Sequence, residues 1–162
     1  MADVARAAGV SRQTLYKEFG SRDAFVGALG LREADRFLAD VEETVRENLD
    51  DPSRALAAAF DVFIEAAAAN PLVNAVFRGG SDELLELVTT RGGPLIDHAV
   101  ERLAAVMRSG WSRASERDCH LLSEFLVRLA ISYMTLPDDP SRMTGESIAT
   151  VFGPYIERSL SA

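Results

Sequence analysis

The sequence is poor in the residues that build covalent or metal-bound centres. It has a single cysteine, Cys119, which excludes an internal disulfide, and only two histidines, His98 and His120, which lie far apart in the chain. No cluster of cysteine, histidine and carboxylate residues has the spacing of a metal site. We therefore expect neither a metal nor another cofactor, and we interpret Cys119 as a small core residue.

Long apolar runs are also missing. Stretches such as ALAAAF at 55–60 are far too short to cross a bilayer, and no charged segment followed by an apolar one opens the chain. Nucleophile elbows, phosphate-binding loops and dinucleotide fingerprints are absent, and the glycine pairs at 79–80 and 92–93 are interpreted as turns. We expect a protein that is not an enzyme, does not associate with membranes and works in the cytoplasm.

Charge is unevenly distributed along the 162 residues. The chain carries a net charge of −8, yet residues 1–22 contain four basic side chains against two acidic ones. A basic tip on an acidic chain is typical of a segment that binds a polyanion, although chance also produces such an imbalance in a short stretch. Charge alone therefore permits nucleic-acid binding without deciding it.

Apolar residues recur at helical spacing along most of the chain. Capping residues, glycines and prolines divide it into nine expected helices, at 2–8, 12–19, 21–48, 52–69, 72–78, 81–90, 94–108, 117–136 and 144–160. No window alternates apolar and polar residues between turn signals, so no strand is expected. The sequence predicts an all-α protein.

The first two expected helices meet at the short turn Gly9-Val10-Ser11. Such a turn forces a tight crossing, which is the helix-turn-helix arrangement, and its second helix enters the major groove of DNA. We expect an apolar set to be buried between the helices: Val4, Ala5, Ala8, Val10, Leu15 and Phe19. The outward face then offers basic, amide and hydroxyl groups for base edges and phosphates: Ser11, Arg12, Gln13, Thr14, Tyr16, Lys17 and Arg22.

Residues 1–25, MADVARAAGVSRQTLYKEFGSRDAF, resemble the DNA-binding segment of the tetracycline-repressor (TetR) family of bacterial regulators. The similarity lies in the turn VARAAGVS, in TLYKEF, and in the cap GSRDAF that opens the next helix. The rest of the chain matches only in its helical layout. By this resemblance Tyr16 and Arg22 would contact phosphates, and the groove-facing set would be Arg12, Gln13, Thr14 and Lys17.

The resemblance implies a homodimer that binds palindromic double-stranded operator DNA, usually as a repressor, and is released by a small-molecule effector. It also implies two domains, a helix-turn-helix segment at 1–25 and a helical effector-binding and dimerisation domain at 26–162. Family members carry a further helix before this pair, so the DNA-binding segment is expected to be N-terminally incomplete. The alternative is an effector-binding dimeric helical module that no longer binds DNA.

Two sets of residues in the body are expected to bind partners. A small, largely apolar effector would lie between the helices at 52–69, 94–108 and 117–136, although aromatic residues of this kind also form ordinary cores. The expected wall is Phe60, Phe63, Phe77, His98 and Phe125, where His98 is either a ligand contact or an ordinary hydrogen-bonded histidine. The last two helices carry apolar stripes suited to a partner chain: Leu122, Leu126, Leu129, Tyr133, Ile148, Phe152 and Tyr155.

Overall fold

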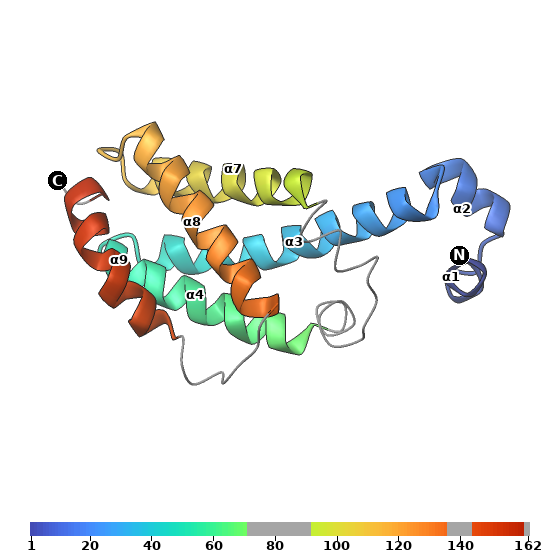
Figure 1. The fold of residues 1–162 in the computed structure, drawn as a ribbon, viewed down its shortest axis with the longest axis horizontal. Coiled ribbons are helices and arrows are strands. Elements are labelled where there is room, and N and C mark those ends of the chain that lie inside the picture. Colours follow the sequence, from blue (N-terminus) through green and yellow to red (C-terminus); the bar gives the residue numbers. More distant parts are fainter. Residues whose placement is uncertain (71–91, 136–143, 161–162) are drawn as a thin grey trace. The chain divides into compact units, whose positions relative to one another are not determined.

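The computed structural model describes residues 1–70, 92–135 and 144–160, which form helices joined by short turns (Figure 1). The helices within these ranges are α1 (Ala2–Ala7), α2 (Arg12–Phe19), α3 (Arg22–Glu47), α4 (Pro52–Ala69), α7 (Gly93–Gly110), α8 (Glu116–Thr135) and α9 (Gly145–Leu160). The described ranges contain no strand, so the predicted all-α class is confirmed. The expected helices at 72–78 and 81–90 lie outside the described residues.

The chain divides into two compact units, Met1–Glu33 and Ala34–Ala162. The first unit contains α1, α2 and the beginning of α3. The second contains the remainder of α3 together with α4, α7, α8 and α9. α3 therefore belongs to both units.

Local hydrogen bonds close the turn between α1 and α2. Gly9 has a φ of 67°, a left-handed conformation that glycine adopts without strain, and the Val10 backbone N–H donates to the Ala5 carbonyl at 3.0 Å. Ser11 caps α2, because its hydroxyl accepts a hydrogen bond of 3.0 Å from the Thr14 backbone N–H. Together these contacts form the predicted helix-turn-helix.

The apolar interior of the first unit is smaller than predicted. Ala5 and Leu15 are buried, with 2% and 7% of their surface exposed, and the rings of Phe19 and Phe25 meet edge to face at 5.1 Å. Two members of the expected set, Ala8 and Val10, are exposed. The prediction is wrong there because α1 ends at Ala7, so the helical spacing on which it relied does not extend into the turn.

In the second unit, α4 lies beside α9 and α7 lies beside α8 (Figure 1). One continuous apolar core joins all five helices of this unit. It takes, for example, Val45 from α3, Phe60 from α4, Met107 from α7, Leu122 from α8 and Ile156 from α9, each no more than 5% exposed. Within a helix, core residues recur every three or four positions in the sequence, and this spacing places them on its inner face.

Cys119 also lies in this core and is fully buried. Burial raises the pKa of its thiol, which keeps the sulfur protonated and unreactive at neutral pH. The interpretation of Cys119 as a small core residue is confirmed.

Specific polar contacts fix the ends of the later helices. The Trp111 indole N–H donates to the Leu49 carbonyl oxygen at 3.0 Å, which ties the end of α7 to the segment after α3. At the start of α9, the Gly145 backbone N–H donates to Asp61 of α4 at 2.6 Å. A side chain at Gly145 would collide with the backbone oxygen of Ala57, so the close approach of α9 to α4 requires glycine there.

In the ranges that the structure describes, no helix combines the length and the apolar character that a membrane span requires.

Candidate functional site

The outward face of α2 is the candidate nucleic-acid interface. The buried side chain on this helix is Leu15, and the residues on the opposite face of the helix are exposed. α2 has eight residues and is therefore about 12 Å long, a length that fits across the major groove. All seven residues predicted to contact DNA are exposed: Ser11, Arg12, Gln13, Thr14, Tyr16, Lys17 and Arg22.

The two hydroxyl residues at the start of α2 are held by each other. Besides the cap, the Ser11 and Thr14 hydroxyl oxygens lie 2.8 Å apart and share a hydrogen bond. This pair orients the first turn of α2, where backbone N–H groups are open to an anion. Because the Thr14 hydroxyl is engaged in this way, its methyl group is the part that suits contact with a thymine methyl.

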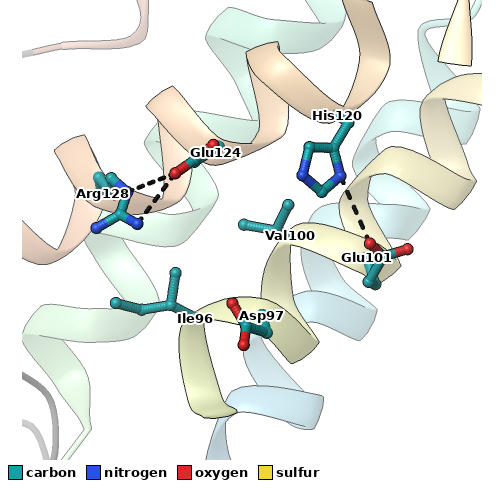
Figure 2. Close-up of a pocket in the computed structure, with 7 residues that line it drawn as sticks. All are labelled: Ile96, Asp97, Val100, Glu101, His120, Glu124 and Arg128. Atoms are coloured by element: carbon teal, nitrogen blue, oxygen red, sulfur yellow. Dashed lines mark hydrogen bonds and ion pairs between the residues drawn. The ribbon is translucent and has the colours of Figure 1, made fainter. Parts of the chain in front are cut away.

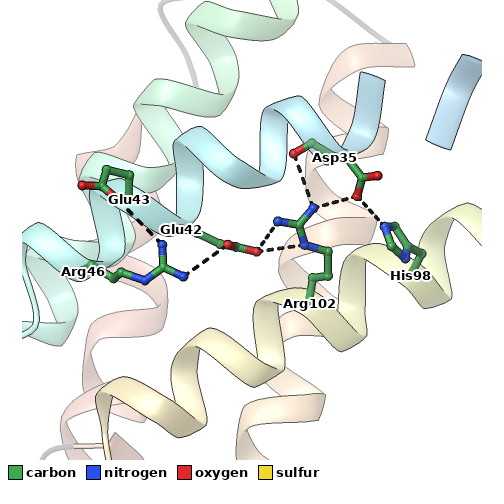
Figure 3. A network of polar contacts seen from close by, with 6 residues as sticks. All are labelled: Asp35, Glu42, Glu43, Arg46, His98 and Arg102. Carbon is green, nitrogen blue, oxygen red and sulfur yellow. Dashed lines mark hydrogen bonds and ion pairs between the residues drawn. The ribbon is translucent and has the colours of Figure 1, made fainter. Parts of the chain in front are cut away.

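A polar network connects α3 to α7 within the second unit (Figure 3). The Arg102 guanidinium on α7 lies 2.6 Å from Asp35 and 2.6 Å from Glu42, both on α3. The His98 Nε2 lies 2.7 Å from the same Asp35 carboxylate. Arg46 extends the network to the other Glu42 oxygen at 3.3 Å. One arginine on α7 thus holds two carboxylates that are seven residues apart on α3.

The electrostatics of this network favour its charged form. Hydrogen bonds from His98 and then from Arg102 lower the pKa of Asp35. Partial burial opposes the charge on Arg102, but hydrogen bonds to Asp35 and Glu42 outweigh it and raise the pKa of the guanidinium. Sequence reasoning missed the network because its partners are about 60 residues apart and each looks like an ordinary surface charge on its own helix.

Among the described residues of the predicted effector wall, the structure brings Phe60 and Phe63 together but not His98 and Phe125. Phe60 is 5% exposed and belongs to the core, while the half-buried ring of Phe63 lies 6.2 Å from that of Phe60. His98 on α7 has its hydrogen-bond partner in Asp35 on α3, and Phe125 is 62% exposed. Phe77 lies outside the described residues. Phe125 thus lies outside the core of the single chain, since a helix that is apolar on most sides does not reveal its inner face. His98 has the partner of an ordinary hydrogen-bonded histidine, and its contact with an effector stays a prediction.

A small pocket lies instead between α7 and α8 (Figure 2). Its polar wall contains two internal pairs, Arg128 with Glu124 at 3.0 Å and His120 with Glu101 at 3.5 Å. Ile96 and Val100 supply its apolar part, and Asp97 completes the lining. No group of three metal-ligating side chains is found in the described part of the chain, so the carboxylates here are not arranged around a metal.

The predicted dimer stripes also lie differently. Leu122, Leu126 and Ile148 are buried in the core of their own chain, at 2%, 5% and 4% exposure, so they are not available to a partner. The other four predicted residues are half-buried: Leu129, Tyr133, Phe152 and Tyr155. The large apolar side chains that these helices expose are Phe125 on α8, at 62%, and Val151 on α9, at 72%.

Two family models match the chain. The model of bacterial regulatory proteins of the tetR family matches residues 1–29, and the model of the bacterial tetracyclin repressor C-terminal domain matches residues 51–154. The first match contains the whole helix-turn-helix, and the second begins just before α4 and ends within α9. Both units therefore have counterparts in the same family.

Individual relatives agree with these matches. The chain is 36% identical over 159 residues to the HTH-type transcriptional regulator AlkX of Mycobacterium tuberculosis, which is 98% of this chain and 75% of that protein. The structure of this chain is similar to the crystal structure of the TetR family repressor AlkX from a Dietzia species, a repressor implicated in biodegradation of n-alkanes. That similarity has a TM-score of 0.85 and 30% identity, and it covers 98% of this chain and 87% of the other. The matched proteins are transcriptional regulators and not enzymes, and this chain belongs to the TetR family of bacterial transcriptional regulators.

Proposed function

We propose that this chain acts as a homodimeric repressor that binds palindromic operator DNA and leaves it when a small apolar effector binds to its body. The observation that carries the proposal is the exposed outer face of α2, which combines Arg12, Gln13 and Lys17 on a capped helix of a helix-turn-helix. The similar Dietzia protein is described as a repressor, which supports repression rather than activation. Such a regulator would act in the cytoplasm, where bacterial DNA lies.

In this proposal some residues on the outer face of α2 contact bases and others contact phosphates. Arg12 and Gln13 read base edges, because guanidinium and amide groups form paired hydrogen bonds to guanine and adenine. Phosphate oxygens are contacted by Tyr16, Lys17 and Arg22, which fix the register of the protein on the DNA. Ser11 lies at the N-terminus of α2, where backbone N–H groups bind a further phosphate. Thr14 contributes its methyl group to the groove. Each of these side chains is exposed, as such contacts require.

We propose that the dimer forms through the outer faces of α8 and α9. Phe125 and Val151 are large apolar side chains that the single chain leaves in water, and covering them with a second copy would stabilise the pair. Half-buried Leu129 and Phe152, which pack against the core, would widen the contact. A two-fold interface of this kind matches the symmetry of a palindromic site and should bury more than about 1,200 Å² in total.

The effector is proposed to be a largely apolar molecule of alkane-like character. The relative from Dietzia is implicated in biodegradation of n-alkanes, which favours this class of ligand. We propose the half-buried ring of Phe63 as a contact, because it lies 6.1 Å from the ring of Phe37 and so stands where α4 meets α3. α3 belongs to both units, so a displacement of α3 by the ligand would also move the part of α3 that belongs to the DNA-binding unit.

The proposal is tested by selecting binding sites from the genome of the host with the full-length protein. Enriched fragments should share a palindromic motif, and their affinity should fall steeply with salt, because lysine and arginine contacts to phosphates release counterions. Adding n-alkanes of graded length should then release the selected DNA. If no fragment is enriched while n-alkanes still bind to the protein, the chain would be an effector-binding module that no longer binds DNA.

A further inference from the structure

The acidic side chains of the first unit differ in whether they have a partner. Asp3 pairs with Arg6 at 3.1 Å on α1, and Asp23 and Glu33 also have interaction partners. Glu18 on α2 is exposed and forms no hydrogen bond or ion pair with any residue that the structure describes. Among the acidic side chains of residues 1–33, all of which are described, Glu18 is therefore the one left unpaired.

The local structure of α2 does not favour an anion at Glu18. This residue lies in the last turn of α2, just before the C-cap Gly20, where the negative end of the helix dipole favours cations and disfavours anions. Lys17 is its neighbour in the sequence, but side chains at successive helix positions do not face each other, so the two do not pair. Glu18 therefore contributes no stability to α2.

The other unpaired charges on α2 are cations. Arg12 and Lys17 are exposed, have no partner among the described residues, and are both proposed DNA contacts. α2 has eight residues and is about 12 Å long, which is close to the Debye length of about 10 Å at 0.1 M salt. Phosphates that lie against α2 are therefore within the range of the Glu18 charge, which opposes the attraction of the two cations.

We propose that Glu18 limits the affinity of α2 for DNA, because its carboxylate repels phosphates and weakens binding to operator and other DNA alike. The inference rests on the proposed function, since it concerns the same DNA-binding helix. The use of such a residue follows from linkage. An effector changes the affinity for DNA by a limited factor, so it releases only a complex of limited affinity. Glu18 keeps the complex within that limit.

Coulomb's law gives the expected size of the effect. In water, one unit charge about 6 Å from a phosphate changes the affinity about threefold. A homodimer has two copies of Glu18, so the effect on a dimer that contacts both half-sites is about tenfold. Without this negative charge, binding also releases more counterions, so the affinity should depend more steeply on salt.

Glu18→Gln tests the proposal, because glutamine keeps the shape of the side chain and removes its charge. Fluorescence anisotropy with the selected operator and with a scrambled duplex measures both affinities over a range of salt concentrations. We expect Glu18→Gln to bind both duplexes about tenfold more tightly, with a steeper salt dependence and an unchanged preference for the operator. The matched control is Glu47→Gln, which neutralises an exposed carboxylate at the end of α3 that belongs to the body and should leave both affinities unchanged.

Thermal unfolding checks that the variant acts through charge and not through stability. Glu18→Gln should unfold at the same temperature as the unmodified protein or slightly above it, because no partner is lost and an unfavourable charge leaves the last turn of α2. A clearly lower temperature would show that Glu18 has a structural partner in solution and would overturn the proposal.

The binding results separate this proposal from the proposed function. Equal affinities of Glu18→Gln and the unmodified protein would overturn the role of Glu18 while operator binding by the unmodified protein still stands. A gain confined to the operator and dependent on one base pair would also overturn it, since Glu18 would then contact a base. If neither protein bound any DNA, the proposed function would be refuted, and the role of Glu18 with it.

Discussion

The Arg102 guanidinium lies 2.6 Å from the Glu42 carboxylate, and the Glu42 side chain keeps only 14% of its surface exposed. The same guanidinium reaches Asp35, which lies about two turns closer to the unit boundary. α7 therefore holds α3 through a partly buried, multiply hydrogen-bonded cation, which is stronger than a pair of surface charges. This contact fixes the part of α3 that belongs to the body.

Removing the cation should destabilise the body. We expect Arg102→Ala to lower the free energy of unfolding by about 1–3 kcal/mol, because the partly buried Glu42 carboxylate loses the closer and more buried of its two arginine partners. Arg46→Ala is the matched control, since Arg46 also pairs with Glu42 but is 53% exposed, and it should cost less than about 0.5 kcal/mol. Urea unfolding at one protein concentration measures both, and equal losses would contradict the special role of Arg102.

The contact between Tyr155 and Asp118 predicts a pH dependence. The tyrosine hydroxyl donates to the carboxylate at 2.7 Å, which raises the pKa of Tyr155 above 10.0 and lowers that of Asp118 below 3.8. The raised tyrosine pKa contributes stability that is fully present below pH 10 and lost as pH rises through the raised value. The lowered aspartate pKa contributes stability above pH 3.8, which is lost as pH falls through the lowered value.

The ultraviolet absorbance of tyrosinate measures this coupling. The titration of the unmodified protein minus that of Tyr155→Phe isolates Tyr155, whose midpoint should lie above 10.0. In Asp118→Asn the midpoint should move back toward the ordinary value, because the carboxylate that favours the neutral phenol is gone. A midpoint unaffected by Asp118→Asn would show that the hydrogen bond is not made in solution.

Two glycines at helix starts should respond oppositely to alanine. Gly145→Ala should destabilise the protein by about 1–3 kcal/mol, since the new methyl group meets the Ala57 backbone oxygen and α9 must shift. Gly93→Ala, at the start of α7, meets no atom of the described residues within 4 Å and should be neutral or stabilising by up to about 1 kcal/mol. Thermal unfolding of the two variants separates them, and a neutral Gly145→Ala would refute the close approach of α9 to α4.

Exposed and buried positions on α8 and α9 should respond differently to a charge. We expect Phe125→Glu and Val151→Glu to give folded monomers, because both side chains are exposed in the single chain and the charge remains in water. Leu122→Glu should unfold the chain, since it would bury an unpaired charge in the core. Sedimentation equilibrium with circular dichroism distinguishes these outcomes. Dimers that persist in both exposed-site variants would place the interface elsewhere.

Helix positions were predictable from the sequence because local residues determine them. Ser11 and Gly20 bound α2 in the structure as the sequence indicates, and Pro52 begins α4. The outward face of α2 was equally predictable from the sequence. In a short helix with a single buried leucine, the side that carries the leucine faces inward and the opposite side faces solvent. These features depend on interactions within a few residues, which a sequence displays directly.

The inner face of α8 was not predictable in the same way. Phe125 and Leu126 are neighbours of similar hydrophobicity, yet one is 62% exposed and the other 5%. Periodicity cannot choose between faces when apolar residues surround the helix, and only packing against α4 and α7 decides. The partnership of His98 with Asp35 was hidden for a related reason, because it joins residues 63 positions apart.

The most direct test of whether α2 reads DNA compares binding to the selected operator with binding to a scrambled duplex. Both affinities are measured for the unmodified protein and for Arg12→Ala. Fluorescence anisotropy over a range of salt concentrations gives both affinities and their salt dependence. The account predicts that Arg12→Ala loses about 1–3 kcal/mol of preference for the operator. It predicts that Lys17→Ala weakens binding to both duplexes alike, with a shallower salt dependence. An unchanged preference in Arg12→Ala and in the matching Gln13→Ala variant would contradict the account, because the bases would then be read by another part of the protein.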